Sequence, residues 1–159
     1  MGFVNTILGG GRSNPHSWGG VGLCGPDRPT LVSDSCRLGR VIAAGVEKVV
    51  VSDLVRDDMA EVIEDAFRYD RMVIMAPTYD AGLFPAMEDF LNHLKAKNYC
   101  NRKVGIVENG TWAPMAAKKM VEMVSAFKNV TLAETVVTIK SALNADSEAA
   151  LDKLVAELA

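Results

Sequence analysis

Two stretches of the sequence gather aromatic, polar and small residues directly after an apolar run. The first is "PTYDAG" at 77–82, and the second is "NGTWAP" at 109–114. Each contains one aromatic residue for stacking on a flat ring, Tyr79 or Trp112. The hydrogen-bonding side chains beside them are Thr78, Asn109 and Thr111. These residue types together suit a planar heteroaromatic cofactor.

A purely structural interpretation of the same residues also stands. Tyr79 and Trp112 would then cap helix ends, and the glycines would serve turn geometry only. No single residue decides between the two interpretations.

A cofactor that carries a phosphate needs another loop, rich in hydroxyls and backbone donors, at the start of a helix. Thr30, Ser33 and Ser35 stand immediately before a predicted helix that begins at Arg37. They are candidate phosphate ligands, although the same pattern suits a simple helix cap. The glycine-rich stretch at 8–14 is a weaker candidate because it lacks the P-loop pattern and no helical pattern follows it.

Other kinds of site have few candidate residues. The three cysteines form no C-x-x-C pair, and two histidines cannot build a histidine-rich metal centre. We predict no metal site and no catalytic side chain. The net charge of −3 gives no basic surface for nucleic acid or an anionic membrane. No run approaches the roughly 20 apolar residues of a membrane span, so we expect a cytoplasmic protein with small-molecule or protein partners.

The composition divides the chain into two regions. Residues 1–36 contain eight of the thirteen glycines and three of the six prolines, whereas 37–159 has the composition of a globular domain. Within 37–159, apolar periodicity predicts alternating helices and strands. The strands are predicted at 47–54, 71–76, 103–108 and 131–140. Helices are predicted at 37–46, after Asp57 or Asp58, from Pro85, from Pro114 and over 147–158.

This alternation is typical of an α/β fold with a doubly wound parallel sheet. In such sheets ligands bind beyond the carboxyl ends of the strands. Both aromatic stretches follow strand ends of this kind, which places them at one edge of the predicted sheet.

With these loops identified, the chain resembles the flavodoxin-like domain of flavodiiron proteins, also called A-type flavoproteins. The resemblance covers 37–159, and "APTYDAGLFPAMEDFLNHLKAKNY" and "KVGIVENGTWAP" carry it. It implies a five-stranded flavodoxin-like sheet of order 2-1-3-4-5 that binds FMN. The implied contacts to the flavin ring come from Pro77, Thr78, Tyr79, Asp80 and Gly82 on one side. On the other side they come from Asn109, Gly110, Thr111 and Trp112.

The resemblance further implies an electron carrier rather than a stand-alone enzyme. A rubredoxin or flavin reductase would supply electrons, a diiron protein would accept them, and the domain would form head-to-tail dimers. Asp80 near the ring would disfavour the anionic reduced flavin and so lower its potential. Two alternatives stay open: a cofactor-free structural or interaction domain, and a small NAD(P)H-dependent quinone or flavin reductase.

The chain departs from that family at two points. It has neither the length nor the histidines for a diiron domain, and its first strand is not evident in the sequence. Glycine and proline weaken the stretch before Thr30, where the central strand is expected. Residues 1–36 are therefore a divergent first strand, a disordered tail, or the product of a truncated or frame-shifted gene start.

Overall fold

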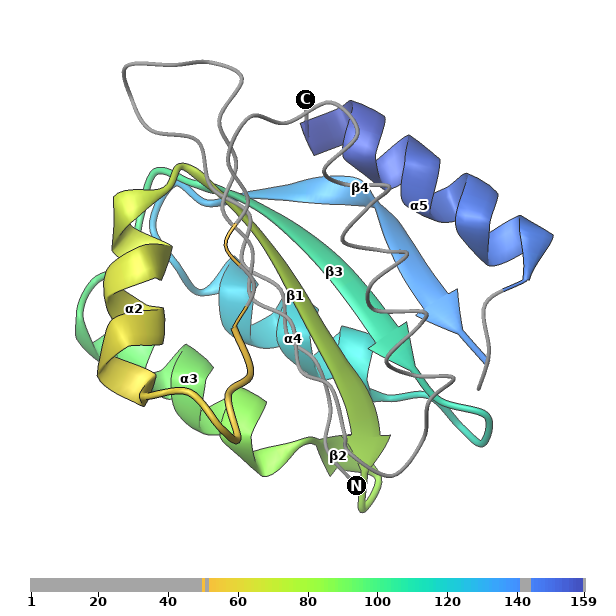
Figure 1. The fold of residues 1–159 in the computed structure, drawn as a ribbon, viewed down its shortest axis with the longest axis horizontal. Helices are drawn as coiled ribbons and strands as arrows, with labels where there is room; N and C mark the ends of the chain where they lie inside the picture. Colours follow the sequence, from red (N-terminus) through yellow and green to blue (C-terminus); the bar gives the residue numbers. More distant parts are fainter. Residues whose placement is uncertain (1–49, 51, 141–143, 159) are drawn as a thin grey trace.

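The computed structural model describes residues 50, 52–140 and 144–158, which form a sheet with helices on both faces (Figure 1). The sheet has the order β2-β1-β3-β4, in which β1, β3 and β4 are parallel and β2 is antiparallel to β1. This confirms the predicted α/β class. The elements in chain order are α2 (Met59–Arg68), β1 (Arg71–Tyr79), β2 (Gly82–Leu83), α3 (Pro85–Ala96), β3 (Lys103–Asn109), α4 (Ala116–Ser125), β4 (Thr131–Ile139) and α5 (Ala145–Leu158).

The two faces of the sheet are buried under different helices. Alternate residues of β1, such as Met72 and Ile74, pack in one core with α2, α3 and α4, whereas Val73 packs in the other with α5. This period of two follows from the alternating side-chain directions of a strand. Each helix buries the apolar stripe whose helical period predicted it. The buried members are Val62, Ile63 and Ala66 in α2, Met87, Phe90, Leu91 and Leu94 in α3, Ala116, Met120 and Val124 in α4, and Leu151, Leu154 and Leu158 in α5.

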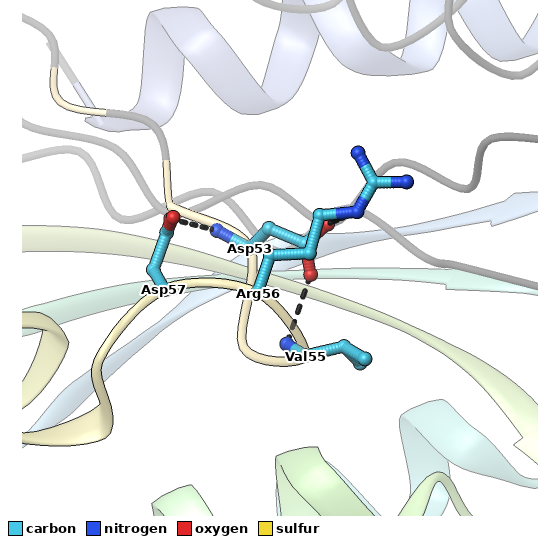
Figure 2. A network of polar contacts seen from close by, with 4 residues as sticks. All are labelled: Asp53, Val55, Arg56 and Asp57. Atoms are coloured by element: carbon cyan, nitrogen blue, oxygen red, sulfur yellow. Dashed lines mark hydrogen bonds and ion pairs between the residues drawn. The ribbon is translucent and has the colours of Figure 1, made fainter.

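A polar network shapes the turn that leads into α2 (Figure 2). The backbone N–H of Asp53 donates to Asp57 Oδ2 at 2.5 Å, and that of Val55 donates to Asp53 Oδ1 at 2.9 Å. Arg56 Nε lies 3.6 Å from Asp53 Oδ2. Asp58 then caps the helix by accepting from Ala60 N–H at 2.7 Å, so the second of the two predicted caps is the one used.

Two of the predicted boundaries that the structure corrects lie beside the aromatic stretches. The strand expected to end at Ala76 continues through Pro77 to Tyr79, because the parallel ladder with β3 runs on to the pair Pro77 and Asn109. A strand accepts proline where its nitrogen faces no ladder hydrogen bond. The helix expected to open at Pro114 begins at Ala116 instead. Side chains of neighbouring strands cap this helix, and no spacing within 109–116 contains that information.

The aromatic stretch at 77–82 contains a tight hairpin turn. Thr78 pairs with Leu83 and Tyr79 with Gly82, which leaves Asp80 and Ala81 as the two turn residues. Their φ angles are 47° and 55°, so both lie in the left-handed region that a two-residue hairpin of this hand requires. Aspartate tolerates this region better than alanine, for which it costs about 1–2 kcal/mol. The strained residue is therefore Ala81, and Gly82 lies in β2.

Replacement of Ala81 by glycine is expected to raise the free energy of unfolding by about 0.5–1 kcal/mol, because relief of the left-handed strain exceeds the added entropy of an unfolded glycine. Urea unfolding followed by circular dichroism measures this gain. Ala149, exposed within α5, provides the control, since Ala149→Gly should lower stability by about 1 kcal/mol. A loss in both variants would show that the turn carries no strain.

A bulge in β4 is held by a carboxylate of α5. Between the pairs Val104–Leu132 and Ile106–Val136, β4 has three residues where β3 has only Gly105. The N–H of Thr135, inside this bulge, donates to Glu157 Oε2 at 2.9 Å, and the Thr135 hydroxyl donates to Glu157 Oε1. These hydrogen bonds from Thr135 hold the pKa of the Glu157 carboxyl below its ordinary value. A side chain of α5 thus satisfies a donor that the bulge removes from the ladder.

Several predictions concern residues outside the described ranges. They are Thr30, Ser33 and Ser35, the helix at 37–46, most of the strand at 47–54, and the character of 1–36. Within the described part of the chain, none of the helices has both the length and the apolarity needed to cross a lipid bilayer.

Candidate functional site

The two aromatic stretches lie side by side at the carboxyl edge of the sheet (Figure 1). In the ladder between β1 and β3, the last pair is Pro77 and Asn109, where β3 ends, and β1 continues for two more residues. Beyond that pair, the chain turns into the β2 hairpin on one side and into 110–115 on the other. The structure therefore brings together Pro77, Thr78, Tyr79, Asp80 and Gly82 with Asn109, Gly110, Thr111 and Trp112.

Thr78 joins the two stretches directly. Its hydroxyl oxygen accepts from the backbone N–H of Met115 at 2.8 Å and from that of Ala116 at 3.1 Å. A side chain of β1 therefore caps α4, which has no cap of its own, since Met115 offers no side-chain hydrogen bond. The Thr78 oxygen is occupied by these two donors, and its hydroxyl hydrogen is the group left for a ligand.

Glycine suits position 110 because neighbouring atoms lie close to it, not because its backbone adopts a conformation that favours glycine. A Cβ atom at this position would lie 3.2 Å from Pro114 Cβ and 3.4 Å from Thr78 Oγ1. The N–H of Gly110 donates to Ile139 O at 3.0 Å, which continues the pairing with β4 past the end of β3. The chain thus folds tightly over Thr78 before it reaches Thr111.

Glu108 is a site residue that our sequence reasoning missed. It is the last buried residue of β3, 6% exposed. Its Oε2 accepts from Ala117 N–H at 2.8 Å, and its Oε1 accepts from the Thr138 hydroxyl at 2.8 Å. The signal was present in the sequence: a strand covered on both faces leaves no place for a carboxylate unless donors meet it.

Three N–H groups at the start of α4 are consequently in use. Met115 and Ala116 donate to Thr78, and Ala117 donates to Glu108. A helix start is a common place for a phosphate because its N–H groups are free. At α4 these three are not free, so this edge can receive a flat polar ring more readily than a phosphate.

The aromatic residues of the site face solvent. Trp112 is 91% exposed and Tyr79 is 56% exposed, although both are large apolar groups. The Tyr79 ring contacts Phe84 edge to face, with 6.2 Å between centroids and 86° between planes. Tyr79 thus has an aromatic neighbour in Phe84, whereas Trp112 stands out on its loop with Thr111 and Ala113 also exposed. The two rings offer apolar surface for a ligand that stacks.

Three hollows of the described surface lie away from the two aromatic stretches. One lies between α2 and α3, one between α3 and α4, and one at the opposite edge of the sheet, around Arg102 and Lys103. No group of three or more histidine, cysteine or acidic side chains in the described ranges is arranged to hold a metal ion. The predicted phosphate ligands Thr30, Ser33 and Ser35 lie outside those ranges, so their role stays a prediction.

No protein-family model matches the sequence, and no curated protein matches it either. Solved structures do match. The rubredoxin oxygen:oxidoreductase of the anaerobe Desulfovibrio gigas is similar with a TM-score of 0.69 at 16% identity, over 79% of this chain and 32% of that one. The flavodiiron core of Flv1 from Synechocystis sp. PCC6803 is similar with a TM-score of 0.66 at 14% identity, again over 79% and 32%.

This chain therefore spans about a third of the length of those two proteins. A smaller protein, oxidised flavodoxin 1 from Bacillus cereus, is similar with a TM-score of 0.63 at 18% identity, over 79% of this chain and 89% of that one. Likeness at such low identity concerns the fold. Residues 71–158, with their parallel strands and their helices on both faces, belong to a doubly wound sheet of the flavodoxin-like fold.

Proposed function

We propose that the chain is an FMN-binding electron-transfer module, with the flavin ring between the β2 hairpin and the loop after β3. The observation that carries this proposal is the exposure of Tyr79 and Trp112 on adjacent loops at the carboxyl edge of the sheet. Exposed aromatic faces at a strand-end edge favour a flat ligand. The likeness to flavodoxin 1 and to the Flv1 flavodiiron core supports a flavin as that ligand.

The residues present fit the ring end of this cofactor. Trp112 and Tyr79 would stack on the ring, while the Thr78 hydroxyl hydrogen and backbone groups of the loops would meet its polar edge. Three N–H groups at the start of α4 are used internally, so the phosphate would be held elsewhere. The hydroxyls of Thr30, Ser33 and Ser35 are its proposed ligands. When bound, FMN supplies one-electron and two-electron transfer, and the protein tunes its potential.

The electron partners follow from this role as part of the proposal. A rubredoxin or a flavin reductase would donate electrons, and a diiron protein would accept them. The carboxylate of Asp80 at the hairpin turn would oppose a negative charge on the reduced ring and lower its potential. These assignments rest on the proposed cofactor.

Titration of the full chain with FMN, followed by quenching of flavin fluorescence, tests the proposal. Trp112→Ala is expected to weaken binding about tenfold, because a stacked aromatic contact contributes about 0.5–1.5 kcal/mol beyond its buried area. Tyr79→Phe keeps the ring and should bind nearly as the parent does. Val136→Ala, which removes an exposed apolar side chain from the edge strand β4, serves as the control with unchanged affinity.

Three results would contradict the proposal. A purified chain that carries no flavin and binds none when FMN is added would favour a cofactor-free domain. Binding that Trp112→Ala leaves unchanged would place the ring elsewhere. Oxidation of NAD(P)H with a quinone by the chain alone would favour the reductase instead of a carrier.

A further inference from the structure

Among the residues that the structure describes, the loop that presents Trp112 is held at both of its ends but not along its length. We define the Trp112 loop as residues 110–115. At its start, Gly110 N–H donates to Ile139 O, and at its end Met115 N–H donates to Thr78 Oγ1. Between these points, Thr111, Trp112 and Ala113 are exposed. The direction in which Trp112 stands therefore depends on how the two ends are fixed.

Glu108 is the residue that connects these ends. It directly precedes Asn109, from which the chain enters the loop, and its Oε2 accepts from Ala117 N–H in the first turn of α4, where the loop leads. Its Oε1 accepts from Thr138, next to Ile139, whose carbonyl holds Gly110. One carboxylate thus joins β3, β4 and α4 around the base of the loop. Glu108 is 6% exposed and Ala117 is 8% exposed, so little water competes for the hydrogen bond between them.

We infer that Glu108 is a positioning residue for the Trp112 loop, and that it preorganises the indole for a stacked ligand. In its role toward FMN this inference rests on the proposed function, whereas its effect on the loop does not. A carboxylate suits the task because its two oxygens can accept from two directions at once. If its loss leaves the loop in the binding conformation for only about a tenth of the time, the apparent Kd rises about tenfold.

Trp112 itself reports on the loop without any ligand. The sequence has two tryptophans, so Trp18→Phe leaves Trp112 as the only indole emitter. In this background we expect Glu108→Ala to increase the amplitude of fast motion in the fluorescence anisotropy decay of Trp112. Glu108→Gln should restore the parent decay, because Oε1 of glutamine accepts from Ala117 while its amide donates to the rotatable Thr138 hydroxyl.

Glu157→Ala is the matched control. Glu157 also accepts one backbone N–H and one threonine hydroxyl, both from Thr135 of β4. Glu157 lies near the end of α5. There the carbonyl of Leu158 accepts a hydrogen bond from Nη1 of Arg71, the first residue of β1, so Glu157 lies toward the edge of the sheet opposite the Trp112 loop. Its loss should destabilise the fold while leaving the Trp112 decay and the FMN affinity unchanged.

The FMN titration of the same variants completes the test. Glu108→Ala should raise the Kd about tenfold, with Glu108→Gln and Glu157→Ala close to the parent. If no variant binds FMN, the proposed function fails, but the anisotropy decay still decides the inference. An unchanged decay and Kd in Glu108→Ala would overturn it, as would equal changes in Glu157→Ala. Should Glu108→Ala fail to fold, Thr138→Val removes one of the two hydrogen bonds, and a loop as rigid as the parent's would overturn the inference.

Discussion

Replacement of Glu108 by alanine is expected to lower the free energy of unfolding by about 3 kcal/mol. A hydrogen bond to a charged group contributes about 1.5–3 kcal/mol, and Glu108 accepts two of them. The losses are not equal. Thr138 is exposed, so its hydroxyl can turn to water, whereas Ala117 is only 8% exposed and its N–H lies at a buried helix start. The expected loss therefore lies near the lower end of the combined contribution of the two hydrogen bonds.

Urea unfolding at neutral pH measures this difference, and two milder variants separate its parts. Glu108→Gln keeps both hydrogen bonds and loses only the charge, which faces the positive end of the α4 dipole, so a loss of about 1 kcal/mol is expected. Thr138→Val should cost a similar amount, since it removes the bond whose donor can reach water. If the free energy of unfolding of Glu108→Ala were within 1 kcal/mol of the parent's, the carboxylate would gain no more from these hydrogen bonds than it loses by desolvation.

The sequence predicts the elements of this fold well because each has a periodic apolar pattern. The stripe of Phe90, Leu91 and Leu94 identifies α3, and that of Leu151, Leu154 and Leu158 identifies α5. The runs at β1 and β3 are apolar on both faces, which indicates strands covered from both sides. Apolar residues recur with the period at which a helix or strand turns its side chains toward the core. A pattern that lasts three helical turns or six strand residues therefore leaves few alternative assignments.

The internal supports of the site are harder to predict. The sequence indicated the two aromatic stretches, yet it assigned the Thr78 side chain to a ligand, and the structure has its oxygen capping a helix that begins 38 residues later. The partners of Glu108 were likewise not predictable, because Ala117 and Thr138 come from two other elements. Such contacts depend on three-dimensional packing, and no local spacing encodes them. The same cause explains the helix boundary misplaced at Pro114.

The second prediction with a large effect on stability concerns Gly105, where β3 contacts α5. A Cβ atom at this position would lie 2.9 Å from Leu158 Cδ1, 3.2 Å from Leu154 Cδ1 and 3.3 Å from Val73 Cγ2. Alanine in a strand is ordinarily better than glycine by about 0.5–1 kcal/mol. Here three side chains of a filled core surround the added methyl group, and overpacking costs about 1–3 kcal/mol. We therefore expect Gly105→Ala to lower the free energy of unfolding by about 2 kcal/mol.

A double-mutant cycle with Leu158 distinguishes crowding from any other cause. Leu158→Ala alone creates a cavity and should cost about 2–5 kcal/mol, since the side chain is 1% exposed. In that background the nearest crowding atom is gone, so Gly105→Ala should become neutral or stabilising. The two substitutions would then differ from additivity by about 2 kcal/mol, within the range found for residues in contact. Additive losses measured by urea unfolding would show that Leu158 does not crowd a side chain at position 105, because only direct contact couples these two positions.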